Sequence, residues 1–167
     1  IPFAELSSNY TKNKFVPEYQ FSDLRNQHVE GIRIVDSKFF IYNDDQSKDI
    51  SPDATTIAGQ GFHYFVQEFL NQFKSDEAKV VRFVLPGKLS SFDFRIRLLG
   101  KENLDNNGSA LNLRFEPQNW FIRMLAPKME VKYDSNTKRL LEYRGPSNVF
   151  DERGKVQNVK IIYDYAQ

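Results

Sequence analysis

The chain has 167 residues with a formal net charge of +1, and 40% of its residues are hydrophobic while 27% are charged. These values are typical of one globular domain with a sizeable core, and the near-neutral charge excludes the strongly basic surface of nucleic-acid-binding proteins. The lack of cysteine excludes disulfides, thiolate metal sites and cysteine nucleophiles, and it is compatible with the cytosol or with an oxidising bacterial envelope.

The beginning of the chain predicts a trimmed product. It opens with IPFAEL and without methionine, and we expect that an export signal and a first β segment are absent from it. No apolar run approaches the length of a membrane span, so a transmembrane segment is not expected in this chain. Upstream residues that complete the sheet remain an open alternative.

The first half of the chain predicts few regular elements before residue 60. Residues 1–30 indicate a short strand followed by an ordered loop, and residues 32–42 read as one strand or two short ones. Asn43–Ala54 is polar and contains a proline, which favours a loop.

One amphipathic helix is predicted at about residues 60–73. An apolar stripe at helical spacing begins at Phe62 and ends at Phe73. Gly59 and Gly61 lie at its entry, and the polar segment KSDE follows its end.

After the helix the apolar period changes to two, which predicts consecutive antiparallel strands. The alternating segments are residues 80–85, 92–98, 110–116, 129–133, 141–143 and 159–163, and the reversals are placed at Pro86-Gly87, Asn106-Asn107-Gly108 and residues 134–138. The predicted fold is mainly β (α+β), with a curved antiparallel meander or half-barrel packed on the one main helix. A single domain over residues 1–167 is expected.

The segment FDFRIRL (residues 92–98) raises the question of what its charged face contacts. Pairing Arg95 with Arg114 would oppose like charges, which is destabilising. A slip by two residues sets Asp93 against Arg114, and this register is preferred. On this interpretation cross-strand pairs satisfy much of the charged face, and the rest meets water or a partner.

The sequence indicates no catalytic centre, cofactor or metal site. His63 and His28 lack partners at metal-ligand or triad spacing and are interpreted as structural, and phosphate-binding glycine loops do not occur. Asp44, Asp45, Asp49 and Asp53 belong to an acidic loop that could hold a cation but is interpreted as solvated. A non-enzymatic protein is expected.

The segment NWFIRMLAPK (residues 119–128) contains a run of large apolar residues between two strands. Burial in the core is the first interpretation, and a rim that touches a lipid or a protein partner is the alternative. Stacking on single-stranded nucleic acid is disfavoured by the balanced charge.

Three segments carry a resemblance to a known family. GQGFHYFVQEFL (59–70), VRFVLPGKLSSFDFRIR (81–97) and YDSNTKRLLEYRGPSNVFDERGK (133–155) resemble an uncharacterised family of exported gammaproteobacterial proteins. The similarity extends from about Pro17 onward. It implies a periplasmic location, and it implies neither an activity nor functional residues.

Two functional hypotheses follow from these observations. The first is a non-enzymatic periplasmic module that binds a lipid or another hydrophobic molecule in an apolar concavity, and its candidate contacts are Phe94, Phe115, Trp120 and Tyr143. The alternative is a structural or protein-interaction domain of the cell envelope without a small-molecule ligand, whose partner-facing residues are Arg95, Arg97 and Arg114.

Overall fold

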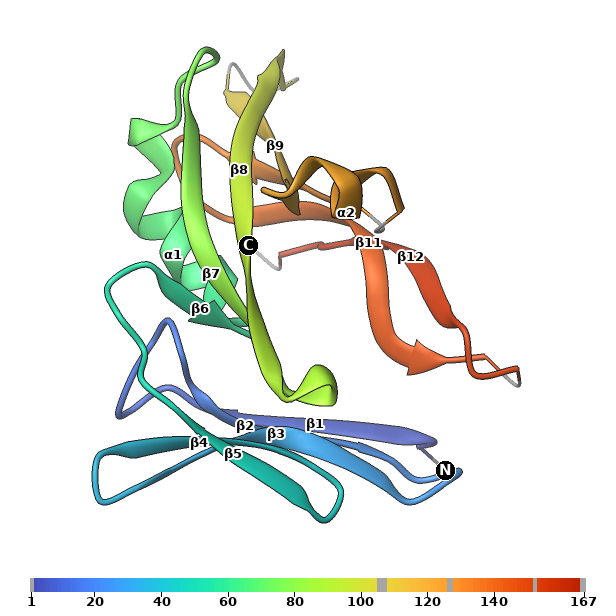
Figure 1. Cartoon of the computed structure of the whole chain (residues 1–167). Coiled ribbons are helices and arrows are strands. Elements are labelled where there is room, and N and C mark those ends of the chain that lie inside the picture. Colours follow the sequence, from blue (N-terminus) through green and yellow to red (C-terminus); the bar gives the residue numbers. More distant parts are fainter. Residues whose placement is uncertain (1, 105–107, 126–127, 152, 166–167) are drawn as a thin grey trace. The chain divides into compact units, whose positions relative to one another are not determined.

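The strands form two sheets in the part of the chain that the computed structural model describes, which is residues 2–104, 108–125, 128–151 and 153–165 (Figure 1). The first sheet has the strand order β1-β2-β3-β4-β5 and is antiparallel throughout. Its strands are β1 (Ala4–Asn9), β2 (Glu18–Asp23), β3 (His28–Val35), β4 (Lys38–Asn43) and β5 (Gln46–Ile50).

The second sheet has the strand order β12-β11-β10-β9-β8-β7-β6. Its strands are β6 (Thr56–Ala58), β7 (Ala78–Leu85), β8 (Ser90–Asn103), β9 (Ser109–Pro117), β10 (Met129–Asp134), β11 (Leu140–Phe150) and β12 (Val156–Ile162). β6 pairs with β7 in parallel, whereas β8 to β12 form the antiparallel meander that the sequence predicts.

The helical elements are few in the described residues. They are α1 (Gly61–Phe69), its continuation η1 (Leu70–Gln72), the short turn η2 (Pro86–Lys88) and α2 (Trp120–Leu125). The prediction of a mainly β fold with one main helix is confirmed, and α1 with η1 occupies the predicted range. In the described part of the chain, no helix has the length and apolar character that crossing a bilayer requires.

The chain divides into two compact units. Unit 1 comprises residues 1–65 and 81–92, and unit 2 comprises residues 66–80 and 93–167. Each unit has its own buried apolar residues, which are described below. A single domain over residues 1–167 stays a prediction.

The core of unit 1 is built from alternate residues of its strands. The buried cluster contains Val16, Tyr19, Ile32, Ile41, Ala58 and Val84. The approach of β2 and β3 is so close that a Cβ on Gly31 would lie 2.0 Å from the carbonyl oxygen of Tyr19. Glycine is therefore required at this position of β3.

The N-terminal prediction is wrong in two places. Residues 1–30 contain β1 and β2 rather than one strand and a loop, and the predicted loop at 43–54 contains β5. β1 (AELSSN) and β5 (QSKDI) are polar edge strands with mostly exposed side chains, so neither shows the apolar alternation of a half-buried strand. They are held by backbone pairing with β2 and β4.

The core of unit 2 lies on one face of the meander. Leu111, Leu113 and Phe115 of β9 are buried, and so are Val131 and Tyr133 of the neighbouring β10. The η1 residue Leu70 is also fully buried, and the side-chain amide of Gln67 donates to the carbonyl oxygen of Lys138 at 3.0 Å. The helical segment of unit 2 is thereby tied to the turn between β10 and β11.

Two of the three predicted reversals are confirmed. Pro86-Gly87 begins η2, and residues 134–138 connect β10 to β11. The carboxylate of Asp134 accepts the backbone N–H groups of Asn136 and Thr137 at 2.8 and 2.9 Å, which fixes this second turn. The third reversal involves Asn106 and Asn107, which lie outside the described residues.

Candidate functional site

The polar face of the meander in unit 2 carries a row of charged residues that crosses five strands. Arg97 of β8 lies opposite Arg114 of β9, and Arg114 lies opposite Glu130 of β10. Glu130 is also opposite Arg144 of β11, which in turn is opposite Lys160 of β12. Four cations and one carboxylate thus follow one another across the sheet, and we call this set the cationic row.

This arrangement corrects the predicted register between β8 and β9. Arg97 rather than Asp93 faces Arg114, a difference of four residues. Ile96 lies opposite Phe115 and Leu98 opposite Leu113, so the register still buries the apolar face. The like-charge pair that argued against such a register is tolerated because carboxylates from neighbouring positions lie beside both arginines.

Glu116 is the carboxylate nearest to the β8 arginines. Its Oε1 accepts from Arg95 Nε at 2.6 Å and lies 4.0 Å from Arg97 Nη1. The Glu116 side chain is only 4% exposed, compared with 28% for Arg95 and 45% for Arg97. A nearly buried carboxylate therefore holds one arginine closely and attracts a second one that remains accessible.

Two further carboxylates serve the other cations of the row. Glu130 Oε1 accepts from Arg114 Nη2 at 2.7 Å. Glu142 of β11 accepts a short hydrogen bond from Arg144 and lies 3.4 Å from Lys160 Nζ. Burial alone would raise the pKa of the Glu142 carboxyl, but its hydrogen bonds with Arg144 and Lys160 outweigh burial and lower that pKa.

A hollow of about 280 Å³ opens on the same polar face. Its lining combines charged residues with a few apolar ones: Leu99, Gly100, Asn112, Leu113, Glu130, Val131, Lys132, Glu142 and Arg144. The strand register shifts between Leu98 and Gly100, and a Cβ on Gly100 would meet nothing within 4 Å. The β-bulge and the missing side chain of Gly100 therefore leave this space open.

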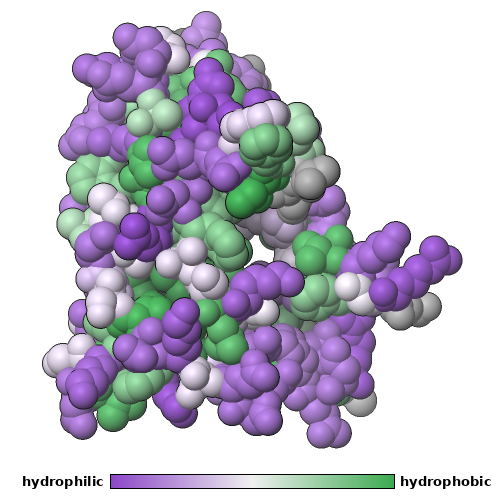
Figure 2. Space-filling view, in the orientation of Figure 1, coloured by the Kyte–Doolittle hydropathy of each residue, from purple (hydrophilic) through white to green (hydrophobic). Residues whose placement is uncertain are grey.

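The apolar run that was first interpreted as core is exposed, so this interpretation is wrong. It forms α2, on which Trp120 is 53% exposed, Phe121 60%, Ile122 45% and Met124 70%. Asn119 caps the helix by accepting the Phe121 N–H at 3.0 Å. Figure 2 shows hydrophobic side chains, in green, on the outer surface of α2, and we call these four residues the α2 patch.

The candidate ligand contacts are distributed over two environments. Phe115 is buried in the core of unit 2, and Phe94 is partly buried opposite Pro117 on the same face. Tyr143 is partly buried, its hydroxyl donates to the Pro146 carbonyl oxygen at 2.6 Å, and burial raises its pKa to about 12. Trp120 lies on the exposed α2, stacked on Phe121 with ring centroids 3.6 Å apart.

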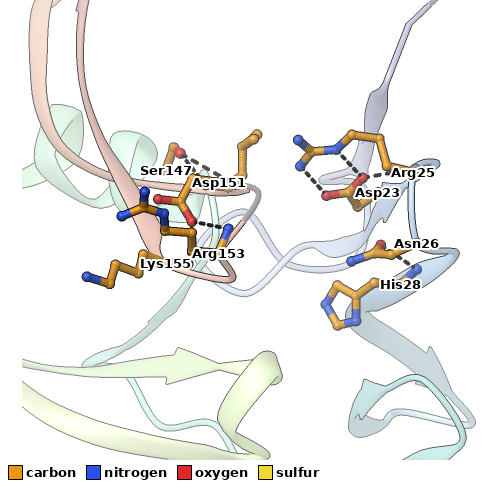
Figure 3. Close-up of polar contacts among 9 residues, drawn as sticks. Asp23, Arg25, Asn26, His28, Ser147, Asp151, Arg153 and Lys155 are labelled. Carbon is orange, nitrogen blue, oxygen red and sulfur yellow. Dashed lines mark hydrogen bonds and ion pairs between the residues drawn. The ribbon is translucent and has the colours of Figure 1, made fainter.

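The histidines and the acidic loop do not form a metal site in the described residues, where no group of three His, Cys, Asp or Glu side chains could hold a metal ion. His28 Nδ1 lies 3.1 Å from an Asp44 carboxylate oxygen, and its backbone N–H donates to the Asn26 side chain (Figure 3). Asp23 in the preceding strand pairs with Arg25 at 2.6 Å. Burial lowers the pKa of His63, which lies on α1.

A second polar turn connects β11 to β12. The Asp151 carboxylate accepts the backbone N–H groups of Arg153 and Lys155 at 2.9 and 2.8 Å (Figure 3). In the preceding strand, the Ser147 hydroxyl bonds with both backbone groups of Val149. These contacts close the turn and explain its residue types without a ligand.

The sequence prediction included three members of this charged surface: Arg95, Arg97 and Arg114. It missed the carboxylates Glu116, Glu130 and Glu142, the cations Arg144 and Lys160, and the hollow at Gly100. A signal for Arg144 existed, because Glu142 and Arg144 alternate with Leu141 and Tyr143. The bulge had no comparable signal.

Comparisons with known proteins add no further assignment. Protein-family profiles, curated proteins and solved structures were all searched, and none of them matches this chain.

Proposed function

We propose that this protein is a non-enzymatic binding domain for a lipid or another hydrophobic molecule, and that the α2 patch is the contact surface. The observation that carries the proposal is the exposure of four large apolar side chains along one short helix. Contiguous exposed apolar residues mark interaction sites more often than isolated ones do. A tryptophan next to other large apolar groups is a combination suited to a lipid–water boundary.

The burial in unit 2 supports a surface site rather than an internal cavity. Phe115 and Leu113 are at most 1% exposed, and the helical residues Val66 and Leu70 are fully buried as well. An acyl chain would have to displace packed side chains to reach this face. It meets the α2 patch without any rearrangement.

The experiment uses the intrinsic fluorescence of Trp120, the one tryptophan of the chain. Titration with lauroyl-lysophosphatidylcholine below its micellar concentration should shift the emission to shorter wavelength, because the indole moves from water into an apolar contact. The double variant Phe121→Ser, Met124→Ser should weaken binding about tenfold or more, since it removes two large apolar contacts.

The matched control is Val80→Ser, which removes an exposed apolar side chain elsewhere in unit 2. It should bind as the wild type does. An unchanged Trp120 emission in the wild type, or an equal loss in the control, would refute the proposal.

A second candidate function is a protein-interaction domain without a small-molecule ligand. The observation that favours it is the exposure of apolar side chains on the edge strand β12. This strand is at the end of the strand order and exposes Val156, Ile161 and Ile162 on its two faces. Such an edge accepts a further strand readily. We propose a second copy of the chain as the partner. Sedimentation velocity at about 100 µM should then show dimers, and Ile161→Lys should abolish them. A monomeric wild type would count against this second function.

We also propose a periplasmic location. The resemblance to exported gammaproteobacterial proteins and the lack of cysteine support it. Osmotic-shock fractionation of the source cells should release the protein with the periplasm, and recovery with the cytosol would contradict this location.

A further inference from the structure

The cationic row is not explained by the stability of the sheet. Like charges directly opposite each other on neighbouring strands are destabilising, and the row contains two such pairs, Arg97 with Arg114 and Arg144 with Lys160. An alternation of acids and bases at these positions would avoid the repulsion. The arrangement instead concentrates positive charge along one line.

The nearby carboxylates neutralise this charge only in part. Glu116, Glu130 and Glu142 contact five cations in all, namely Arg95, Arg97, Arg114, Arg144 and Lys160. A further ion pair, Lys132 with Glu102 at 2.7 Å, is neutral in itself. In these ion pairs the cations therefore outnumber the carboxylates by two.

The row reaches the hollow at Arg144, and the lining of the hollow contains the cations Lys132 and Arg144 and the carboxylates Glu130 and Glu142. Arg144 belongs both to the row and to the lining of the hollow, and Lys132 approaches it from the next position on β10. The volume of about 280 Å³ lies just below the range of about 300–1,000 Å³ of small-ligand pockets. A compact charged group fits this space, whereas a folded protein segment does not.

We propose that the cationic row and the hollow at Gly100 form a binding site for an oxyanion, that is, a phosphate or carboxylate group. Guanidinium groups present paired N–H donors that match the oxygen spacing of both groups. Glu130 and Glu142 line the same hollow and accept hydrogen bonds from hydroxyl or amino groups of the ligand. The site is separate from the α2 patch, so this inference does not depend on the proposed function.

The test is isothermal titration calorimetry of the whole chain with inorganic pyrophosphate at low ionic strength. Arg97→Gln and Arg144→Gln should each weaken binding about tenfold, because each removes one charge-assisted contact. Added salt should weaken binding of the wild type. The control Lys101→Gln removes an exposed cation from β8 that neither lines the hollow nor belongs to the row, and it should bind as the wild type does.

The hollow is tested by Gly100→Leu. Since a Cβ there meets nothing within 4 Å, the variant should keep the unfolding temperature of the wild type while its side chain fills the space and abolishes binding. Unchanged pyrophosphate affinity in this variant would overturn the assignment of the hollow.

A second arm separates a free anion from a lipid headgroup. Vesicles of palmitoyloleoyl-phosphatidylglycerol and of palmitoyloleoyl-phosphatidylcholine are compared by co-sedimentation. Binding to phosphatidylglycerol alone, reduced by Arg97→Gln and Arg144→Gln, would support the site with a headgroup as the source of the oxyanion. Binding to neither pyrophosphate nor phosphatidylglycerol, or equal losses in Lys101→Gln, would overturn the inference, whereas the Phe121→Ser, Met124→Ser variant should leave pyrophosphate binding intact.

Discussion

Glu116→Gln should destabilise the protein more than Glu130→Gln, although both remove a carboxylate from the polar face of unit 2. The Glu116 side chain is 4% exposed and Arg95 is 28% exposed, whereas the Glu130 and Arg114 side chains are 38% and 30% exposed. Breaking a fully buried ion pair costs about 3–5 kcal/mol, and an exposed pair contributes up to about 1 kcal/mol. The partial exposure of Arg95 places the expected cost of Glu116→Gln between these limits, at about 2 kcal/mol.

The assay is urea denaturation of the two variants and the wild type, followed by far-ultraviolet circular dichroism. Glu130→Gln should lose about 0.5 kcal/mol, and the slopes of the three transitions should agree. For a chain of this length, the lost 2 kcal/mol corresponds to a decrease of about 4–8 °C in the unfolding temperature. A loss for Glu116→Gln that does not exceed the loss for Glu130→Gln would refute the reasoning from burial.

Glu116→Gln should also change the affinity of the oxyanion site, and this change should be an increase although stability decreases. Removing the Glu116 charge raises the excess of cations over carboxylates in these ion pairs from two to three, so pyrophosphate affinity should rise while stability falls. A merely damaged fold would lower both quantities. Measuring both on one protein sample therefore separates a local electrostatic effect from general unfolding.

Three further predictions concern the rest of the fold. Leu70→Ala should cost about 2–5 kcal/mol in urea denaturation, because the side chain is fully buried, and a loss below 1 kcal/mol would contradict this burial. Gly31→Ala should be strongly destabilising in thermal unfolding and Gly100→Ala nearly neutral, since a Cβ at the first position would lie 2.0 Å from a carbonyl oxygen and at the second meets nothing. The hydrogen bond from Arg25 lowers the pKa of Asp23, so this carboxylate stabilises the fold above about pH 4 and loses its contribution as the pH falls through its lowered pKa. Asp23→Asn should therefore lose less stability over that acidic range than the wild type does. Equal losses in the two proteins would refute the linkage.

The features predicted correctly are those that local patterns determine. α1 and its continuation η1 follow from a stripe of apolar residues at helical spacing, and Phe65 and Val66 of α1 and Leu70 of η1 are buried. The strands of the meander follow from alternation, because a strand with one buried face must place apolar residues at every second position. Both patterns act within a window of a few residues.

The register of β8 depended on a strand outside the pair that was considered. Opposing Arg97 and Arg114 looks unfavourable when β8 and β9 are taken alone. In the structure Glu130 of β10 holds Arg114, and Glu116 holds Arg95 and attracts Arg97. Cross-strand pairing between two strands therefore underdetermines the register when a third strand supplies the counter-ions.

The position of α2 was mispredicted for a different reason. Large apolar residues are buried more often than not, so the composition of residues 120–125 favours the core. Asn119 caps a short helix on which the four residues of the α2 patch are exposed. The cap fixes where the helix begins, but it does not determine which of its side chains become buried. Exposure of such a run is an exception to the general rule, and function is the usual reason for such exceptions.

The two proposed contact surfaces of unit 2 are distinguished by their response to salt. Apolar contact at the α2 patch involves no change in ion pairing, so sodium chloride should leave lysophosphatidylcholine binding almost unchanged. Oxyanion binding depends on the excess charge of the cationic row, and the Debye length falls from about 30 Å at 0.01 M to about 8 Å at 0.15 M. A ligand that uses both surfaces must carry an anionic group and an apolar group, and its affinity should decrease with salt only to the level that the α2 patch sustains alone. An affinity that is insensitive to salt would assign binding to α2, and one that vanishes with salt would assign it to the row.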